Sequence, residues 1–417
     1  MDDSDQERDF APPISQSYLL CVSVPIIIDE KGVRWCNELW AKDLALHLNY
    51  LTDLTVACPR IFAKPTKLDV PLNVAPFDRL NFIELPVSKN HWGAIILLPG
   101  LLWKMWRGVR KATVVHTGFG WWPISEGWMA VPMGKLQAKF VVTNVESSFW
   151  RVTSDAKWHR RVRGAITEHL NRYCISVADL RFFTSKAYVD EFLKKNAERA
   201  YVIPATWIDE EQILTEDQAS VCWSSKTGKI RLLYAGTLVS EKGVNVLIEA
   251  VRQVAQEHAK LAITIIGSGP LQRACADLAA SLTENSVSVV MLEPVKYGEP
   301  FLNLLRSFDA VLAPSLSDEQ PRVIFDAFSQ AVPVLGSDTG GIREVVDHQL
   351  NGQLFAAGQV DALAKALDWA SHNRQTLQAM GMNALAKCRQ FTHRSMHVTR
   401  HGILLKALNS KARTSTT

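Results

Sequence analysis

The chain has 417 residues, which exceeds what one hydrophobic core usually supports and therefore favours two domains of ordinary size. Hydrophobic residues make up 47% and charged residues 21% of the chain, a composition that excludes a largely disordered protein. The formal net charge of +4 is mild and does not demand a nucleic-acid partner, so we expect none.

The N-terminus MDDSDQERDF is acidic where a signal peptide would be basic, so we expect residues 1–15 to form a disordered acidic tail and no secretory segment. The seven cysteines are scattered, with no CxxC and no Cys/His ligand spacing, which is typical of a reducing cytosol. The longest apolar stretch, residues 92–103, is shorter than the roughly 20 residues that a membrane-spanning helix needs, and Pro99-Gly100 interrupts it. We therefore expect a cytoplasmic protein without a membrane span.

Short apolar runs alternate with longer helical patterns along the whole chain. In the first half the predicted strands are residues 18–24, 54–58, 81–85, 112–117, 140–145, 179–185 and 200–204. In the second half they are residues 230–236, 261–269, 287–292, 309–315 and 332–338, with helical segments such as 244–258 between them. This alternation is typical of parallel βαβ units with helices on both faces of a sheet. We predict an α/β protein of two doubly wound, Rossmann-like domains.

The domain boundaries follow from the same pattern. We expect an N-terminal domain over residues 16–205, a linker over 206–229 and a C-terminal domain over 230–390. Residues 391–417 are expected to form a helix that returns to the first domain and ends in a disordered segment. Ligands of doubly wound sheets bind beyond the carboxyl ends of the strands, so chemistry is to be sought there.

Several common motifs are absent or incomplete. Glycine pairs at 118–120 and 267–269 each follow a strand, but the third glycine position of GxGxxG holds Pro123 and Gln272, which disfavours an NAD-dependent dehydrogenase. The single DxD triplet, residues 3–5, lies in the acidic tail, so we expect no metal site. Neither HExxH nor GxSxG occurs.

Three glycine-containing segments follow strands of the second half. In residues 236–243, GTLVSEKG, Lys242 can reach a phosphate and offset negative charge on a leaving group; the alternative is a solvated lysine at a helix start. Residues 267–270, GSGP, suit the close approach of a planar base or a phosphate. Gly340-Gly341 is either a plain turn or a backbone anion site.

The stretch SDEQPRVIFDAFSQAVPV, residues 317–334, places Asp326 inside an apolar helix. A buried unpaired carboxylate is costly, so this acid is either turned to solvent or held for a partner such as the vicinal hydroxyls of a sugar or ribose. Asp318 and Glu319 stand before Pro321, a residue suited to begin a helix whose N–H groups can bind phosphate. The alternative makes both acids ordinary first-turn residues favoured by the helix dipole.

These motifs occur in a recognisable order. Gly-x-Leu-Val-x-x-Lys-Gly, the GSGP turn, APS, acid-x-x-Pro-x-x-x-Phe-acid-Ala, Ala-x-Pro-Val and Thr-Gly-Gly-x-x-Glu resemble retaining glycosyltransferases of the GT-B fold, family 4 (glycosyl transferases group 1). The resemblance is strong over residues 230–370 and weaker over the N-terminal half, where it rests on strand order and on Gly32. It implies two Rossmann-like domains facing a central cleft, with an acceptor-side N-terminal domain and a nucleotide-sugar-binding C-terminal domain.

The resemblance also implies roles for individual residues. Lys242 would contact the donor diphosphate, and Gly32 falls where the family has a glycine-rich loop facing it. Asp318 and Asp326 replace the two glutamates of the family's Glu-x7-Glu motif, near the donor sugar and at the ribose; both are one methylene shorter, so Glu319 could substitute for Asp318. The implied catalytic residues are Asp318, Glu319 and Lys242, and the implied donor-binding residues are Gly32, Thr237, Gly267, Gly269, Leu292, Arg322, Val323 and Asp326.

Two further departures from the family pattern affect the expected chemistry. The arginine usual after the glycine of the Lys242 segment is Thr237, and we hypothesise that Arg322 supplies the missing cation. The donor-facing histidine expected after the strand 140–145 is Val145, with Glu146 beside it. The second loss leaves a changed or lost activity open.

We expect an enzyme that transfers a hexose, with retention, from a UDP- or GDP-linked donor to a glycan or lipid-linked acceptor in polysaccharide or glycoconjugate biosynthesis. No cofactor is expected, because Lys242 and helix N-termini would offset the diphosphate charge. Two alternatives remain. One is a nucleotide-sugar epimerase of the same fold, and the other is a catalytically degenerate nucleotide-sugar-binding partner of another transferase.

A second surface is predicted around residue 100. On a helical wheel the apolar face carries Leu98, Leu102, Met105, Trp106 and Val109, and the basic face carries Lys104, Arg107, Arg110 and Lys111. A second basic cluster comprises Lys157, Arg160, Arg161 and Arg163. The helix either packs on the N-terminal sheet with a solvated basic face or docks peripherally on the cytoplasmic face of a membrane beside a lipid-linked acceptor.

Overall fold

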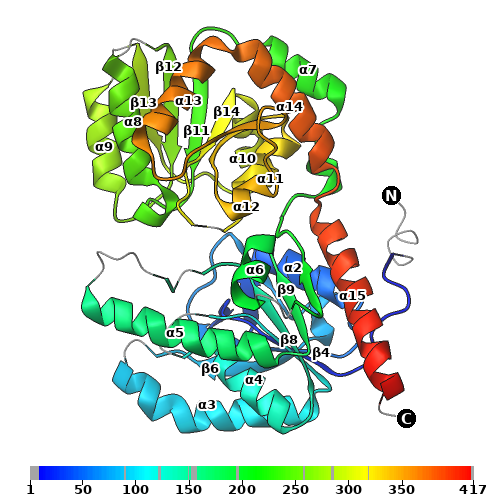
Figure 1. Ribbon diagram of the computed structural model, residues 1–417. Helices are drawn as coiled ribbons and strands as arrows, with labels where there is room; N and C mark the ends of the chain where they lie inside the picture. The colour runs from blue at the N-terminus through cyan, green and yellow to red at the C-terminus, as the bar shows by residue number, and fades with distance from the viewer. Residues whose placement is uncertain are drawn as a thin grey trace. The chain divides into compact units, whose positions relative to one another are not determined.

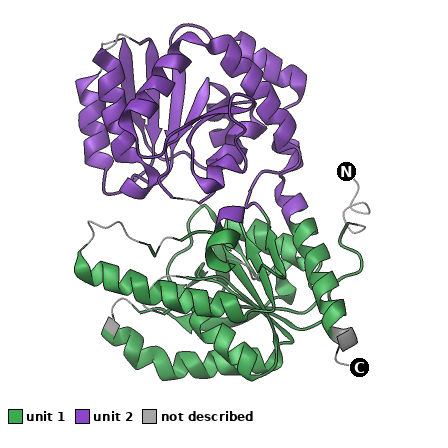
Figure 2. Ribbon diagram, in the orientation of Figure 1, with its two compact units in different colours: residues 1–184, 188–203, 397–417 green, residues 185–187, 204–396 purple. Residues whose placement is uncertain are grey.

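The computed structural model describes residues 9–88, 91–120, 124–148, 150–151, 157–193, 197–256, 259–282, 286–317 and 319–414. The chain divides into two compact units (Figure 2). Unit 1 comprises residues 1–184, 188–203 and 397–417, and unit 2 comprises residues 185–187 and 204–396. Each unit contains its own largely or wholly parallel sheet covered by helices (Figure 1). The prediction of an α/β protein with two Rossmann-like sheets is confirmed.

The sheet of unit 1 is built on parallel strands in the order β6-β4-β1-β7-β8-β9-β10. Their bounds are β1 Tyr18–Cys21, β4 Leu54–Phe62, β6 Asn81–Pro86, β7 Val114–Thr117, β8 Phe140–Val145, β9 Leu180–Phe183 and β10 Ala200–Val202. Every one falls on a predicted apolar run. The order reverses between β1 and β7, so the carboxyl ends of these two strands flank the crevice where a doubly wound sheet binds ligands.

A mixed extension on β4 was not predicted. It consists of β2 (Ile26–Ile28), β3 (Arg34–Asn37) and β5 (Asp69–Pro71), in which β2 runs parallel to β4 and the β2–β3 and β3–β5 pairs are antiparallel. Gly32 lies in the β2–β3 turn with a φ of 77°, a conformation that favours glycine. The amides of Lys31 and Val33 donate to the Asp29 carboxylate, and the Gly32 amide donates to the Asp29 carbonyl. These amides of the turn therefore all bind Asp29. The turn conformation by itself explains why residue 32 is a glycine, without a contact to a diphosphate.

Helices cover both faces of the unit 1 sheet. They are α2 (Glu38–Leu48), α3 (His91–Lys111), α4 (Glu126–Leu136), α5 (Trp158–Val177), α6 (Lys186–Leu193) and part of α15 (His393–Thr414), with the short η1 (Phe77–Arg79). Met105 and Val109 of α3 and Met129 of α4 pack on Leu19 and Val115 of the sheet. Residues 9–15, expected in a disordered tail, contribute buried Phe10 and Ile14 side chains; residues 1–8 lie outside the described ranges.

A buried polar network anchors the C-terminal helix in unit 1. From His397 onward, α15 belongs to this unit, and the His397 ring contacts Asp43 Oδ1 at 3.0 Å and the Tyr50 hydroxyl at 3.3 Å. Arg400 is also buried, and the charges of Tyr50 and Asp43 act to keep its pKa high against the effect of burial. The final helix is therefore fixed by side chains that are costly to bury without partners.

Unit 2 contains six parallel strands in the order β13-β12-β11-β14-β15-β16. Their bounds are β11 Ile230–Ala235, β12 Leu261–Ile266, β13 Val287–Leu292, β14 Ala310–Ala313, β15 Val334–Ser337 and β16 Gly352–Phe355. All but β16 were predicted as strands. This is the strand order 3-2-1-4-5-6 of dinucleotide-binding folds, with the reversal between β11 and β14.

The helices of unit 2 enclose two apolar clusters, one on each face of the sheet. They are α7 (Glu216–Ser224), α8 (Val244–Gln256), α9 (Gln272–Ser281), α10 (Glu299–Arg306), α11 (Val323–Ser329), α12 (Gly340–Arg343), α13 (Val360–His372) and α14 (Arg374–Cys388), with short η2 (Glu210–Gln212) and η3 (Ser240–Lys242). The stretch expected as a linker, 206–229, packs on this unit: Trp223 is buried and its indole donates to the Ala331 carbonyl at 2.9 Å.

The described part of the chain contains neither a membrane-spanning helix nor a disulfide. No helix within it combines the length and apolar character needed to cross a bilayer. None of the seven cysteines forms a disulfide, and all are buried except the partly exposed Cys222.

Candidate functional site

The candidate site in unit 2 lies where the strand order of its sheet reverses. Loops leave the carboxyl ends of β11 and β14 on either side of this point, and the loop after β12 lies beside the loop after β11. These loops are residues 236–243, 267–271 and 314–322. They carry most of the residues that the sequence assigned to a donor site.

The loops after β11 and β12 are joined backbone to backbone. The Gly236 amide donates to Ile266 O at 3.0 Å, and the Leu238 amide donates to Ser268 O at 2.9 Å. A Cβ on Gly267 would lie 1.9 Å from Gly236 O, and one on Gly269 would lie 2.6 Å from Leu238 O. Both glycines are therefore required by the approach of two protein loops, whereas the sequence suggested the approach of a ligand.

The loop after β11 is held against the loop after β14 in the same way. Gly243 has a φ of 72°, and a Cβ on it would lie 1.8 Å from the carbonyl oxygen of Pro314. The Leu316 amide donates to Glu241 O at 2.9 Å. This packing brings Lys242 and Glu319 together: the Lys242 ammonium forms an ion pair with Glu319 Oε1, and each side chain is about a quarter exposed. An accessible cation and carboxylate thus meet at the switch point of the sheet.

Buried polar atoms without protein partners also occur at the carboxyl ends of the strands of this sheet. Among the described residues, Gln320 Oε1, Ser337 Oγ and Thr339 Oγ1 are buried and accept or donate no hydrogen bond. Gln320 follows Glu319 directly, and Ser337 and Thr339 stand at the carboxyl end of β15. Unpaired buried polar groups are costly, so their clustering at one end of a sheet indicates a place for a polar ligand or water.

Asp326 is buried in α11 and has a protein partner. The Tyr297 hydroxyl donates to Asp326 Oδ1 at 2.8 Å. Burial and the neighbouring Asp326 charge raise the pKa of Tyr297, which therefore stays a hydrogen-bond donor. The carboxylate inside the apolar helix is thus held by Tyr297, and its role toward a ribose stays a prediction.

The first turn of α11 differs in detail from expectation. The helix begins at Val323, two residues after Pro321, and Arg322 occupies the N-cap position without a capping hydrogen bond from its side chain. The exposed Arg322 guanidinium lies over the Trp207 ring, 5.4 Å from its centroid. Its proposed phosphate contact stays a prediction. Asp318 lies outside the described residues.

The remaining predicted donor residues are spread along the same strand ends. Thr237 is exposed, and its carbonyl accepts the Tyr234 hydroxyl at 2.9 Å. Leu292 ends β13 with 39% of its surface exposed, and Val323 is half-buried at the start of α11. Gly32 belongs to unit 1.

Unit 1 has a polar cluster at its own switch point that the sequence analysis missed. Glu126 begins α4, is buried, and accepts a hydrogen bond from the hydroxyl of Ser23, after β1, at 3.0 Å. Burial raises the pKa of Glu126. A Cβ on Gly120 would lie 2.1 Å from Ser23 Oγ, so the glycine of the HTGFG stretch makes room for this pair. The sequence signal was an acid six residues after the glycine pair at 118–120.

Val145, which replaces the donor-facing histidine expected from the family resemblance, lies in a described strand. Val145 ends β8 and is buried against Phe183 and Trp150. The adjacent Glu146 is exposed, and its carboxylate accepts the Asn144 amide at 3.0 Å. Val145 therefore serves the core of unit 1 and offers no polar group.

One group in unit 1 has donor atoms suited to a metal. The ligand atoms of Asp43, His47 and His397 lie within 4.8 Å of one another. However, His47 Nδ1 lies 2.9 Å from the Asp43 carbonyl, and its Nε2 faces the Arg400 guanidinium at 3.4 Å. A cationic neighbour and occupied ring nitrogens favour a hydrogen-bond network over a metal site.

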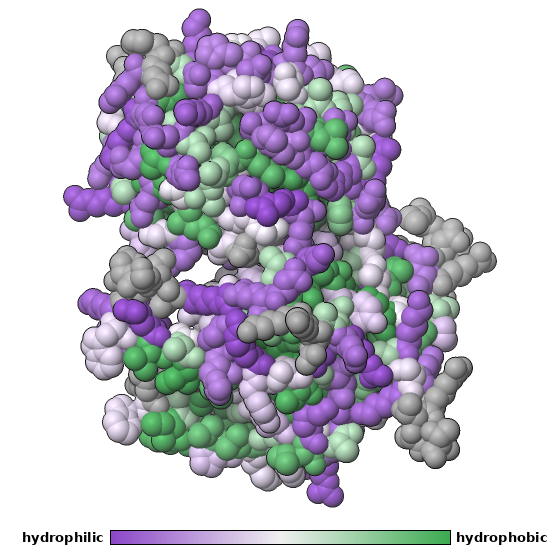
Figure 3. Space-filling model, in the orientation of Figure 1, coloured by the Kyte–Doolittle hydropathy of each residue, from purple (hydrophilic) through white to green (hydrophobic). Residues whose placement is uncertain are grey.

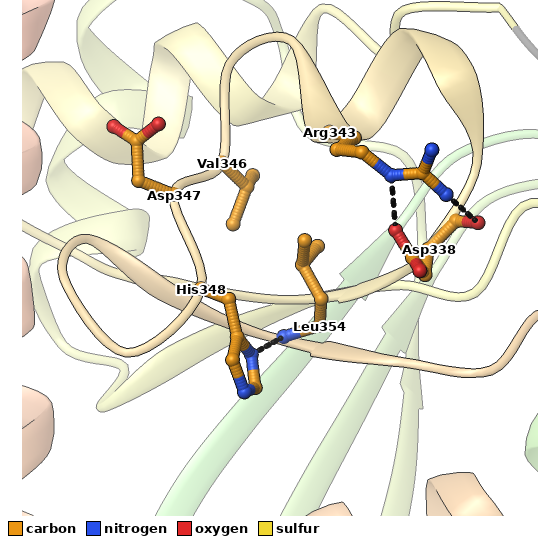
Figure 4. Close-up of a pocket in the computed structure, with 6 residues that line it drawn as sticks. All are labelled: Asp338, Arg343, Val346, Asp347, His348 and Leu354. Atoms are coloured by element: carbon orange, nitrogen blue, oxygen red, sulfur yellow. Dashed lines mark hydrogen bonds and ion pairs between the residues drawn. The ribbon is translucent and has the colours of Figure 1, made fainter.

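An open hollow lies elsewhere on unit 2, around the turn before β16. It is lined by Asp338, Arg343, Val346, Asp347, His348 and Leu354 (Figure 4). The Arg343 guanidinium bonds Asp338 Oδ1 at 2.5 Å, and the Leu354 amide donates to the His348 ring at 3.0 Å. Its charges are paired within the protein, and none of the predicted site residues lines it.

Comparison with known proteins gives a consistent result. Residues 217–387 match the family described as Glycosyl transferases group 1. The amylovoran biosynthesis glycosyltransferase AmsK of Erwinia amylovora is 30% identical over 165 residues, 38% of this chain and 40% of that protein. The chain spans about two fifths or less of the length of the first curated relatives that it matches.

Solved structures extend the similarity to nearly the whole chain. Sucrose-phosphate synthase from Thermosynechococcus elongatus is 16% identical with a TM-score of 0.70, covering 95% of this chain and 100% of that one. HepE from Anabaena, solved in complex with UDP-glucose, is 18% identical with a TM-score of 0.64, covering 94% and 100%. At such identity these structures establish the fold alone. The chain therefore has the GT-B fold, and its residues 217–387 match the Glycosyl transferases group 1 family.

Proposed function

We propose that the protein is a retaining hexosyltransferase of family 4, which transfers a sugar from a UDP- or GDP-linked donor to a glycan or lipid-linked acceptor in polysaccharide or glycoconjugate biosynthesis. The observation that carries the proposal is the Lys242–Glu319 ion pair at the β11/β14 switch point, beside the unpartnered Gln320 Oε1. The group 1 domain and the UDP-glucose complex of HepE support this choice of donor.

The roles of the residues follow from charge and reach. When a nucleotide-sugar breaks at its anomeric carbon, negative charge develops on the leaving diphosphate, and an ammonium at Lys242 would offset it without a metal. Glu319 would then exchange its ion pair with Lys242 for hydrogen bonds to sugar hydroxyls. Asp326, whose carboxylate accepts the Tyr297 hydroxyl, would bind the ribose. In unit 1, the hydrogen-bonded pair of Ser23 and Glu126 at the β1/β7 switch point would serve the acceptor hydroxyl.

A second candidate function has one specific observation in its favour. Val145, at the position where the family has a histidine, is buried in an apolar cluster. A protein that binds a nucleotide-sugar but does not transfer it would carry such a replacement. This candidate shares the donor site and differs only in turnover.

Donor turnover without acceptor, followed by NMR, tests the proposal. The purified chain is incubated with each of a panel of UDP- and GDP-hexoses, and the products are identified by their anomeric and nucleotide signals. Release of the nucleotide with a sugar first formed in the configuration of the donor supports a retaining transferase. Binding without turnover supports the degenerate protein, and a new nucleotide-sugar isomer supports an epimerase.

A further inference from the structure

Helix α3 in unit 1 is apolar on two opposite faces. The inner face packs on the sheet through Leu101, Met105 and Val109, which are at most 8% exposed. Of the apolar face predicted on the helical wheel, Met105 and Val109 pack on the sheet, as the first alternative expected, whereas Trp106 is exposed. The outer face carries a second apolar stripe at helical spacing, with exposed fractions of 78% for Trp92, 59% for Ile95, 77% for Ile96, 58% for Trp103 and 42% for Trp106.

A helix that is apolar all round is normally buried, so the outer stripe of α3 needs an explanation. Single exposed apolar residues are common on soluble proteins, but contiguous sets that include several tryptophans mark interaction sites. Figure 3 shows hydrophobic residues gathered on unit 1 over the region that α3 occupies in Figure 1.

Helix α5 repeats the pattern. Trp158, Val162 and Ile166 follow one another at intervals of four and are 75%, 49% and 47% exposed. They lie opposite the buried Thr167 and Asn171, which face the protein. The first turns of α5 therefore present an apolar stripe of their own.

The two stripes belong to one layer of unit 1. Helix α4 packs against α3 on one side and against α5 on the other (Figure 1). Helices α3 and α5 each connect parallel strands, β6 to β7 and β8 to β9, so both begin at the edge of the sheet where the strands end. We name the exposed residues Trp92, Ile95, Ile96, Trp103, Trp106, Trp158, Val162 and Ile166 the α3/α5 surface.

Positive charge flanks the α3/α5 surface without compensating acids on the same segments. Helix α3 contains no aspartate or glutamate, and neither does the first part of α5, Trp158–Ile166. The exposed basic residues are Arg107, Arg110 and Lys111 on α3, and Lys157, Arg160, Arg161 and Arg163 at the start of α5. The Arg107 guanidinium lies 4.7 Å from the Trp103 ring centroid, so charge and aromatic surface are interleaved.

We propose that the α3/α5 surface docks the protein on an anionic lipid bilayer. Tryptophan is favoured at membrane–water interfaces, where its ring lies at headgroup level, and Lys and Arg beside it attract anionic headgroups. A second copy of the chain fits less well, because two surfaces of the same positive sign would face each other. The contact is peripheral and brings the strand ends of unit 1 near the headgroups, where a lipid-linked acceptor would lie if the proposed transferase function holds.

Vesicle sedimentation with the full chain tests this contact independently of any transferase activity. Vesicles of phosphatidylcholine alone are compared with vesicles that also contain phosphatidylglycerol, at low and high salt. We expect binding to the anionic vesicles at low salt, with at least a tenfold loss at high salt or on neutral vesicles, because screening weakens exposed charge pairs.

Two matched variants locate the contact. The surface variant combines Trp92→Ser, Ile96→Ser and Trp158→Ser, and the control variant combines Val221→Ser and Leu350→Ser, which are exposed apolar residues of unit 2 at 68% and 53%. Both should melt close to wild type, since the side chains are exposed. We expect at least tenfold weaker vesicle binding for the surface variant and unchanged binding for the control.

Three outcomes overturn the proposal. The first is equal vesicle binding by the surface and control variants. The second is no preference for anionic over neutral vesicles. The third is a wild-type dimer, seen by sedimentation velocity, that the surface variant converts to a monomer while vesicle binding is absent throughout, which would assign the surface to a second copy.

Discussion

The hydroxyl of Tyr297 donates a hydrogen bond to Asp326 Oδ1 at 2.8 Å, which explains how a carboxylate can lie inside the otherwise apolar helix α11. The bond occupies one oxygen of the carboxylate and fixes its orientation. A substitution of Asp326 can therefore affect both donor binding and the stability of unit 2.

Asp326→Ala should weaken binding of a nucleotide-sugar by about 1–3 kcal/mol, roughly tenfold to a hundredfold, because a ribose diol would lose its acceptors. Tyr297→Phe removes the hydroxyl that donates to Asp326 but keeps the carboxylate, so most of the affinity for the nucleotide-sugar should remain. Isothermal titration with the donor that binds wild type measures both. If Asp326→Ala melts far below wild type yet binds the donor normally, the carboxylate is structural.

Lys242→Met should lower donor turnover by about tenfold or more, because the leaving diphosphate loses a cation at the switch point. Its melting temperature should change little, since partly exposed ion pairs contribute at most about 1 kcal/mol. Lys365→Met, an exposed lysine on α13, is the matched control. Steady-state kinetics measure the donor turnover of both variants. If Lys242→Met and Lys365→Met lose turnover equally, Lys242 is not part of the site.

Gly267→Ala should destabilise unit 2 by about 1–3 kcal/mol, because the new Cβ would overlap Gly236 O. Gly402→Ala on α15 meets open space and should stabilise by about 0.5–1 kcal/mol through helix propensity. Urea unfolding of both variants checks the pair. A Gly267→Ala protein as stable as wild type would mean that the two loops separate easily.

Because of Lys226, the free energy of unfolding should change with pH between about pH 7 and pH 10.5. The Lys226 side chain is half-buried, with the ammonium 2.6 Å from Phe308 O and 3.4 Å from the Trp223 ring centroid, and desolvation lowers its pKa from 10.5 to about 7. Because the unfolded chain keeps the proton up to about pH 10.5, the free energy of unfolding rises with pH across this window and the stabilisation is lost as the pH falls through 7.

Lys226→Met removes this titration. Between about pH 7 and pH 9 the melting temperature of wild type should rise relative to that of the variant, as followed by circular dichroism. Identical pH profiles for the two proteins would show that Lys226 keeps its ordinary pKa when folded.

Most of the parallel strands could be predicted because their residues form continuous apolar runs, as in residues 261–266, whereas the parallel strand β16 was not predicted. The strands β2, β3 and β5 could not, because each is three or four residues long and depends on pairing with neighbours distant in sequence. On α3, periodicity revealed that apolar residues repeat, but only the tertiary structure shows which of the two stripes contacts the sheet.

The site was predictable to a similar extent. Lys242 and Glu319 were identified from their motifs, but their meeting depends on the packing of Gly243 against Pro314. The unpartnered oxygen of Gln320 could not be inferred, since whether a buried polar atom has a partner is decided by residues far away in the chain.

The account rests on nucleotide-sugar binding by unit 2, and thermal unfolding with a panel of UDP- and GDP-linked hexoses tests it most directly. A ligand at about 100 times its Kd stabilises the native state by about 2.7 kcal/mol, which should raise the melting temperature of wild type by several degrees. The same ligand should raise that of Asp326→Ala much less. If no nucleotide-sugar in the panel shifts the melting of the wild-type protein, the proposed donor site at the β11/β14 switch point is wrong.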